Sequence, residues 1–298
     1  MAWPKLERKD AMFGYIHKRD AAVLAAVLAA CLCLGSAFDY QISCALFNPA
    51  NLYGRAIEAT GELPFEVTAS IAGVMLVRAA DRSRVSGWFQ AVLGVLIAAA
   101  LVVYELHCAL RVDAQLAAVA CIVSLAVMLA ANVVAWRLTP DAAPAELERW
   151  ALMVFAVWIA QAVALNLVVK PLWSRPRMHV IAATPGLEFQ PWWVIGHPEK
   201  AVFIAAGVIK DGFKSFASGH TAHAAIGLML AGLPARALDE RPRRRRLVFW
   251  VAAAVTAAVA LGRIVAGAHF LSDVSCGFAL TFAFECLAAR LAYPHGVQ

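Results

Sequence analysis

The strongest constraint on this chain is a series of long apolar runs. A helix needs about 17–25 mostly apolar residues to cross the hydrocarbon core of a bilayer. Apolar residues make up 62% of the chain and charged residues 15%, compared with about half and a quarter in soluble domains. The second and sixth runs are short and carry polar residues, so six or seven spans remain the alternative count. We predict an all-α, polytopic transmembrane bundle with about eight spans: Ala21–Phe38, Leu63–Ala80, Trp88–Leu106, Ala114–Trp136, Trp150–Val169, Thr221–Ala235, Leu247–Val265 and Phe270–Leu287.

Basic residues predict how these spans are oriented. If the N-terminus is cytoplasmic, most of the 26 Lys and Arg residues fall in cytoplasmic segments, including the cluster from Arg241 to Arg246. This agrees with the bias of Lys and Arg toward the cytoplasmic side. We therefore predict a cell-membrane protein with both termini in the cytoplasm, and we attribute the net charge of +6 to topology rather than to nucleic-acid binding. Tryptophans, which anchor at the interface, fall at the same predicted ends: Trp88, Trp136, Trp150 and Trp250.

The first predicted outer loop, residues 39–62, carries two acidic side chains. Glu58 and Glu62 are four residues apart and would share one face of a short surface helix. The seven cysteines lie mostly inside apolar runs, where cysteine behaves as a small hydrophobic residue. Cys44 and Cys108 are both predicted on the outer side, and whether they pair is left open.

Three cations gather at the outer end of the fifth apolar run, where the sequence reads Lys170-Pro-Leu-Trp-Ser-Arg175-Pro-Arg177. Arg offers planar, bidentate donors that match phosphate oxygens, and Lys adds a point charge. The alternative is that these side chains extend to lipid headgroups, and this cluster alone favours that alternative.

Ser218, Gly219 and His220 open the sixth run. Ser is a common helix N-cap, and Gly lets a ligand approach the backbone closely. The N-terminus of a helix attracts anions, and His220 beside it is able to give a proton. A capped helix start with an incidental histidine is the alternative. His220 and His223 also have the i, i+3 spacing of zinc ligands, but the surrounding cations favour a bound anion over a metal.

A third group lies between the seventh and eighth runs. His269 and Asp273 are four residues apart and would share one helix face, where the Asp fixes the imidazole tautomer and leaves one nitrogen nucleophilic. Gly267 is predicted to break the helix and bring Arg263 and His269 to one site. A purely structural His–Asp pair is the alternative. All three clusters fall at predicted outer helix ends, where ionisable residues are costly and usually functional.

Together the three clusters resemble the signature motifs of the type 2 phosphatidic acid phosphatase superfamily, which includes lipid phosphate phosphatases and vanadium haloperoxidases. The family pattern has a Lys, six residues and Arg-Pro, then Pro-Ser-Gly-His, then Ser-Arg, five residues, His, three residues and Asp. The resemblance covers roughly residues 150–290. The matching residues are Lys170 and Arg177 in the first motif, Ser218, Gly219 and His220 in the second, and Arg263, His269 and Asp273 in the third.

The resemblance implies hydrolysis of a lipid phosphate without a metal or other cofactor. His269 would attack phosphorus and form a phosphohistidine, and Asp273 would orient it. His220 would protonate the leaving oxygen and then activate water. The phosphoryl oxygens would be held by Lys170, Arg177, Ser218, Gly219 and Arg263.

Three positions depart from the family pattern. Met178 and Ala217 stand where the family has Pro, and Gly262 stands where it has Ser. These changes bear on loop rigidity and substrate preference more than on the reaction. The family core has six helices, so we expect a basic cytoplasmic arm at 1–20, two additional N-terminal helices within 21–85, and a six-helix phosphatase core at 86–298 with its motifs within 170–273.

The predicted partners are membrane lipids and a lipid phosphate or diphosphate substrate. Phosphatidate, phosphatidylglycerol phosphate, diacylglycerol pyrophosphate and polyprenyl diphosphate all remain open. A lipid phosphotransferase with the same site, a lipid transporter and a non-catalytic relative are the rival functions. A transporter usually carries charged residues deep inside several helices, whereas here most cluster at helix ends, with Glu285 inside the eighth span as the clearest exception.

Overall fold

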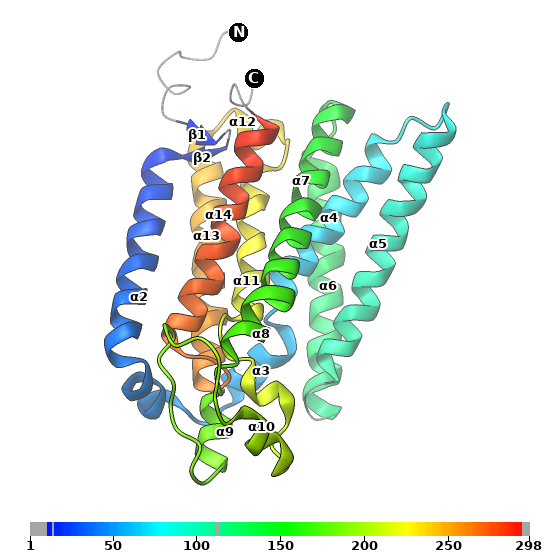
Figure 1. The fold of residues 1–298 in the computed structure, drawn as a ribbon. Helices are drawn as coiled ribbons and strands as arrows, with labels where there is room; N and C mark the ends of the chain where they lie inside the picture. The colour runs from blue at the N-terminus through cyan, green and yellow to red at the C-terminus, as the bar shows by residue number, and fades with distance from the viewer. Residues whose placement is uncertain (1–10, 14, 111, 113, 294–298) are drawn as a thin grey trace.

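The computed structural model describes residues 11–13, 15–110, 112 and 114–293, which form a bundle of helices apart from one short antiparallel hairpin, β1 (Ala11–Phe13) with β2 (Ile16–His17) (Figure 1). The prediction of an all-α membrane bundle is confirmed for this part of the chain, and the chain is a membrane protein. Six segments are long and apolar enough to cross a membrane: Lys18–Leu46, Val85–Cys108, Ala114–Leu138, Pro144–Ala183, Arg243–Val265 and Leu271–Ala292. They coincide closely with, or include, the helices α2 (Lys18–Leu46), α5 (Val85–Ala109), α6 (Ala114–Leu138), α7 (Pro144–Val163), α13 (Pro242–Val265) and α14 (Leu271–Ala292).

The two short predicted spans have a different character from the other six. The helix α4 (Leu63–Ala79) is buried at nearly every position from Phe65 to Leu76. The sixth run is not one span over Thr221–Ala235: it is the helix α11 (Gly219–Ala225), continued by the 3-10 helix η3 (Ile226–Gly232). Helices inside a bundle face protein rather than lipid, so they need not match the bilayer thickness. The count of eight spans is therefore not confirmed.

The two ends of the bundle carry different elements (Figure 1). The hairpin and α12 (Arg236–Asp239) lie at one end. Several short elements form the opposite end: α3 (Leu52–Thr60), α8 (Lys170–Trp173), α9 (Met178–Ala183) and α10 (Lys200–Ala205). The 3-10 helix η2 (Lys210–Phe213) leads from α10 toward α11. Between α7 and α8 the chain forms a π-helix, η1 (Ala164–Val169).

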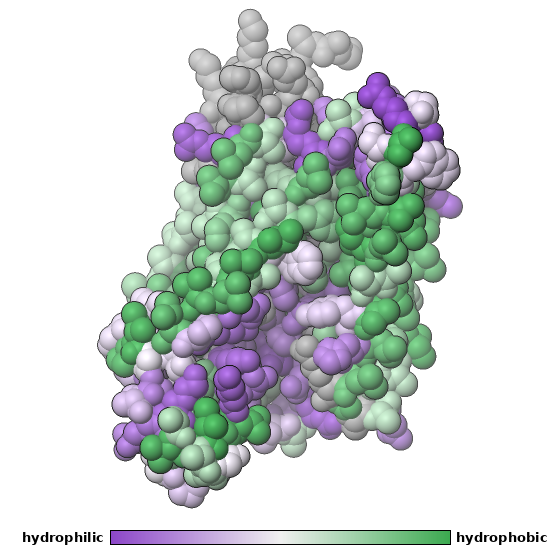
Figure 2. All heavy atoms as spheres, turned by 45° about the vertical axis from the view of Figure 1, so that its right-hand side comes forward, coloured by the Kyte–Doolittle hydropathy of each residue, from purple (hydrophilic) through white to green (hydrophobic). Residues whose placement is uncertain are grey.

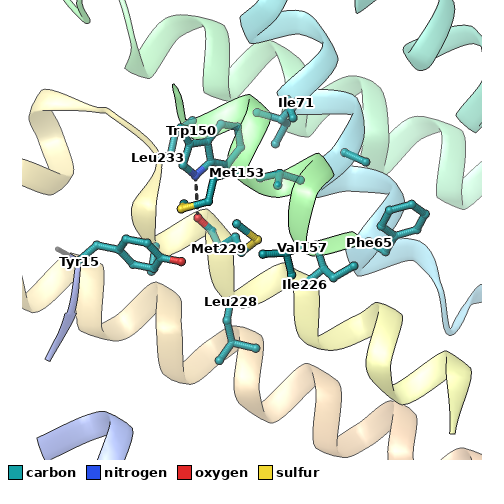
Figure 3. Packing of buried hydrophobic residues seen from close by; sticks show 14 of the residues in the cluster. Tyr15, Phe65, Ile71, Trp150, Met153, Val157, Ile226, Leu228, Met229 and Leu233 are labelled. Carbon is teal, nitrogen blue, oxygen red and sulfur yellow. Dashed lines mark hydrogen bonds between the residues drawn. The ribbon is translucent and has the colours of Figure 1, made fainter. Parts of the chain in front are cut away.

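A central apolar core joins α4, α7 and η3 (Figure 3). Trp150 is fully buried, and its indole nitrogen donates a hydrogen bond of 3.0 Å to the carbonyl oxygen of Met229. Phe65 of α4 and Ile226 of η3 belong to the same cluster. A buried Trp contributes much apolar area and normally satisfies its N–H, as here. This core fixes α7 and α11, the helices that carry cavity residues at their far ends.

The N-terminal helix α2 packs closely against the start of α14. A side chain at Gly35 would place its Cβ 2.8 Å from the backbone nitrogen of Ser272, so only glycine permits this approach. Nearby, the Trp192 indole donates to the Ser36 hydroxyl at 2.9 Å. The segment around Trp192 therefore lies against α2, and within the aromatic stretch 189–193 it is Trp193 that is exposed.

Candidate active site

A polar cavity of about 470 Å³ lies at the end of the bundle formed by α3, α8 and α9. Figure 2 shows hydrophilic residues gathered in a hollow at this end, between hydrophobic surfaces. The predicted site residues that line the cavity are Lys170, Arg177, Gly219, His220, Arg263 and His269. Further lining residues are Glu58, Glu62, Tyr104, His107, Gln161, Leu165, Asn166, Asp211 and His223.

Separate elements bring the three sequence clusters together. Lys170 begins α8 directly after the π-helix, and Arg177 precedes α9 as its N-cap. His220 lies in the first turn of α11, and Arg263 lies near the end of α13. The loop between α13 and α14 supplies His269. Residues almost a hundred positions apart in the sequence thus share one cavity.

The start of α11 has the predicted cap. The Ser218 hydroxyl accepts a hydrogen bond from the Thr221 amide at 3.4 Å, which confirms Ser218 as the N-cap. Ser218 is fully buried, and its hydroxyl also lies 3.0 Å from that of Thr221. A Cβ at Gly219 would lie 3.0 Å from the Lys170 ammonium, so the glycine makes room for this charge. The Lys170 ammonium and the backbone of Gly219 therefore form one wall of the cavity.

His269 lies outside the helix in which it was predicted. The helix α13 ends at Val265, and Gly267 has a φ of 68°, which confirms the predicted break. The helix α14 begins only at Leu271, so the prediction that His269 and Asp273 share one helix is wrong. Asp273 accounts for this start, because its carboxylate accepts the amide of Phe270 at 2.8 Å and caps the helix.

The closest hydrogen-bond partner of His269 is a backbone carbonyl. Its Nδ1 lies 2.6 Å from the Ser215 oxygen, whereas the nearer carboxylate oxygen of Asp273 is 3.8 Å away. A carbonyl only accepts hydrogen bonds, so Nδ1 carries the proton and Nε2 keeps its lone pair. Burial lowers the pKa of His269 to about 3, since the positive form would be poorly solvated beside Arg177 and Arg263. The imidazole is therefore neutral, and its Nε2 carries a lone pair.

Behind His269 lies a buried ionic network that sequence reasoning missed. The Arg175 guanidinium is fully buried and bonds Asp273 at 2.5 Å and Asp39 at 2.9 Å. Asp273 also accepts the Ser215 hydroxyl at 2.5 Å. Asp39 belongs to α2 and accepts the backbone amide of Ser272 at 2.9 Å. Asp273 thus contacts the side chain of Ser215, whose backbone carbonyl lies against His269, and its own carboxylate lies 3.8 Å from the imidazole.

His220 has an acidic neighbour from another part of the chain. Glu62, the residue before α4, lies with its carboxylate 2.9 Å from Nδ1 of His223 and 3.6 Å from Nδ1 of His220. The Tyr104 hydroxyl donates to the same carboxylate. Burial by itself would raise the pKa of Glu62, but the two histidines and the hydrogen bonds hold it well below the ordinary value. In the sequence, only the four-residue spacing of Glu58 and Glu62 drew attention to Glu62.

That spacing was interpreted incorrectly. The helix α3 ends at Thr60, so Glu58 and Glu62 do not share a helix face, although both reach the cavity. Among the residues that the structure describes, no group of three or more His, Cys, Asp or Glu side chains is arranged to hold a metal ion. Cys44 and Cys108 are not joined by a disulfide.

Residues 151–295 match the model of the PAP2 superfamily. No curated protein and no solved structure matches the chain. The match supports the superfamily for the segment that contains all three sequence clusters. Asp39 and Glu62, which contact that segment, and Tyr104, which donates to Glu62, come from the part of the chain before it.

Proposed function

We propose that this membrane protein is a phosphatase of the PAP2 type that hydrolyses a phosphomonoester or diphosphate of a lipid through a phosphohistidine. The observation that carries the proposal is the cavity itself, where a neutral imidazole and three cationic side chains face one another. The superfamily match supports phosphoric ester hydrolysis. We propose that the reaction needs no metal or other cofactor, because the cations in the cavity suit an oxyanion.

The proposed first step breaks the bond between phosphorus and the leaving oxygen. Nε2 of His269 attacks phosphorus, and His220 gives its proton to the departing alkoxide or phosphate. The negative charge on the phosphoryl oxygens is stabilised by Lys170, Arg177 and Arg263, which line the cavity. In the second step His220 takes a proton from water, the oxygen attacks the phosphohistidine, and inorganic phosphate leaves.

The remaining predicted site residues have supporting roles in this proposal. Gly219 lets the Lys170 ammonium and a phosphoryl oxygen approach the backbone. Ser218 caps α11 and orients its first amides, rather than donating its own hydroxyl from the cavity wall. Asp273 holds Ser215, whose carbonyl sets the tautomer of His269.

A lipid is favoured over a soluble substrate by the surroundings of the cavity. Exposed apolar side chains next to cavity residues include Leu106 on α5, Leu167 on η1 and Leu172 on α8, each at least half exposed. Large exposed apolar patches on such helices face lipid. A headgroup would enter the cavity while its chains stayed in the bilayer.

The cavity is proposed to lie on the non-cytoplasmic side of a cell membrane, with both termini cytoplasmic. The loops 80–84 and 139–143 lie at the hairpin end, away from the cavity. The first loop contains Arg82 and Arg84, and the second lies between Arg137 and Arg149; both were predicted to be cytoplasmic, the side that positive charge favours.

Phosphate release from purified protein in detergent tests the proposal. The substrates are phosphatidate, phosphatidylglycerol phosphate, diacylglycerol pyrophosphate and polyprenyl diphosphate, each with EDTA present and each repeated with His269→Ala. We expect release that EDTA does not affect and that the substitution abolishes. Failure of folded wild-type protein to release phosphate from all four would contradict hydrolysis of these lipids. Transfer of labelled phosphate to an added lipid alcohol would instead identify a phosphotransferase.

A further inference from the structure

Glu62 is a cavity residue supplied by the part of the chain that precedes the superfamily match. Its side chain is 8% exposed, and one carboxylate oxygen lies 2.9 Å from Nδ1 of His223. The other oxygen lies 3.6 Å from Nδ1 of His220. Tyr104 donates its hydroxyl to the carboxylate from α5. The carboxylate is thus held from two sides and directed at the histidine proposed as the proton donor.

Two glycines explain how Glu62 reaches this place. A Cβ at Gly262 would lie 2.6 Å from Cγ1 of Ile57, so α3 packs against α13 where the family pattern has a Ser side chain. A Cβ at Gly61 would lie 3.2 Å from Cδ2 of His220, so the turn before Glu62 rests against the imidazole ring. The departure at Gly262 therefore accommodates the helix that delivers Glu62.

The cavity that His220 lines also holds cations, and Glu62 is the carboxylate placed beside the imidazole. Cations nearby disfavour protonation of an imidazole, and a carboxylate within a few ångströms favours it. Asp211 is engaged by the Lys214 ammonium at 2.6 Å, whereas Glu62 lies against His220 itself. The charged or titratable groups around the cavity are Glu58, Glu62, Tyr104, His107, Lys170, Arg177, Asp211, His223, Arg263 and His269.

We propose that Glu62 is a positioning residue that keeps His220 oriented and protonated for transfer of its proton to the leaving oxygen. The proposal rests on the proposed function. His220 keeps its Nδ1 proton toward Glu62 throughout, and the proton on Nε2 passes to the leaving group. Water returns that proton when the phosphohistidine is hydrolysed, so each turnover restores the starting state.

Leaving-group dependence is the first test, using Glu62→Gln in the full-length protein in detergent. A lipid alkoxide is a poor leaving group and needs the acid, whereas 4-nitrophenolate needs little protonation. We expect turnover of the lipid phosphate to fall by about 100-fold and that of 4-nitrophenyl phosphate by less than about threefold. His220→Ala should show the same pattern, and His269→Ala should lose both activities. Equal losses on both substrates in Glu62→Gln would overturn the proposal.

A second test does not depend on hydrolysis. The titration of the His220 imidazole is followed by ¹⁵N NMR in the wild type, in Glu62→Gln and in Glu58→Gln. We expect the titration midpoint to fall by about one pH unit or more in Glu62→Gln. Glu58→Gln removes the same charge from the same cavity and should move the midpoint by less than about a third as much. Equal shifts in the two variants would overturn the role of Glu62. If the midpoint shifts as expected but the wild-type protein releases no phosphate, only the proposed hydrolysis is overturned.

Discussion

His269 and His220, two of the histidines that line the cavity, are held in opposite ways. His269 directs Nδ1 at a backbone carbonyl and is 2% exposed, whereas His220 directs Nδ1 at a carboxylate and is 13% exposed at its side chain. A carbonyl and burial favour the neutral imidazole, and a carboxylate favours the protonated one. In the proposed reaction, the first is the nucleophile and the second is the acid. Neighbouring groups thus separate two identical side chains into two roles.

The groups that hold the two histidines also come from different parts of the chain. Around His269, Ser215 and Arg175 belong to the segment that matches the superfamily, and Asp39 is added from α2. Around His220 the support comes from Glu62 and Tyr104, which both lie before that segment. The N-terminal region is therefore part of the site rather than an attachment to it.

The largest expected effect comes from removing the cation of the buried ionic network behind His269. Arg175→Gln leaves the buried carboxylates of Asp39 and Asp273 without their shared cation, and we expect a loss of about 3–5 kcal/mol in the free energy of unfolding. Denaturant unfolding in detergent measures it. The control is Arg84→Gln, which removes an exposed pair with Asp81 and should change the stability far less, because solvent screens the pair. Similar costs in the two variants would contradict the network.

The free energy of unfolding, measured over a series of pH values, tests the environment of His269 further. The unfolded imidazole binds a proton near pKa 6.5, whereas folded His269 stays neutral down to a pKa of about 3. The folded state therefore loses stability as pH falls from 6.5, by about 3 kcal/mol at pH 4, at about 1.4 kcal/mol per pKa unit. Because other groups also titrate, the measurement is the difference from His269→Gln, whose decline should be smaller. Parallel curves for the two proteins would show that His269 titrates normally.

A steric clash at Gly262 is expected to displace the helix α3, which precedes Glu62 beside His220. Gly262→Ser introduces a Cβ that meets the side chain of Ile57, and we expect a cost of about 1–3 kcal/mol in unfolding free energy together with slower lipid hydrolysis. The double variant Gly262→Ser with Ile57→Gly removes all three clashing atoms, Cβ, Cγ1 and Cγ2 of Ile57. Thermal unfolding and turnover of both proteins form the test. If the second substitution recovers neither stability nor turnover, α3 does not depend on Gly262 for its position.

The smallest effect concerns the contact between α2 and the aromatic segment. Ser36→Ala removes the acceptor of the Trp192 indole and should cost about 1 kcal/mol. Turnover should change little, because neither histidine is touched. Thermal unfolding measures the cost, and Ser83→Ala, at an exposed site, serves as the control.

Sequence patterns were sufficient for the membrane bundle, for the break at Gly267 and for the cap at Ser218. They were insufficient wherever a partner comes from a distant segment. Asp39 falls one residue beyond the predicted first span, so it was not recognised as an ionisable residue within a helix, and α2 in fact continues to Leu46. The spacing of His269 and Asp273 also led to a wrong prediction. A separation of four residues places two side chains on one helix face only if both residues belong to the helix.

The π-helix that precedes Lys170 has a consequence for how this site changes with chain length. The Lys170 amide donates to the carbonyl of Leu165, five residues back, so the stretch 164–169 holds one residue more than α-helical geometry requires. Deleting that residue would let the stretch become a regular α-helix, so the residues after it would keep nearly the same direction, whereas a deletion inside α7 would turn them by about 100°. The direction of the Lys170 ammonium therefore tolerates the loss of one residue within 164–169 but not in the regular helix before it.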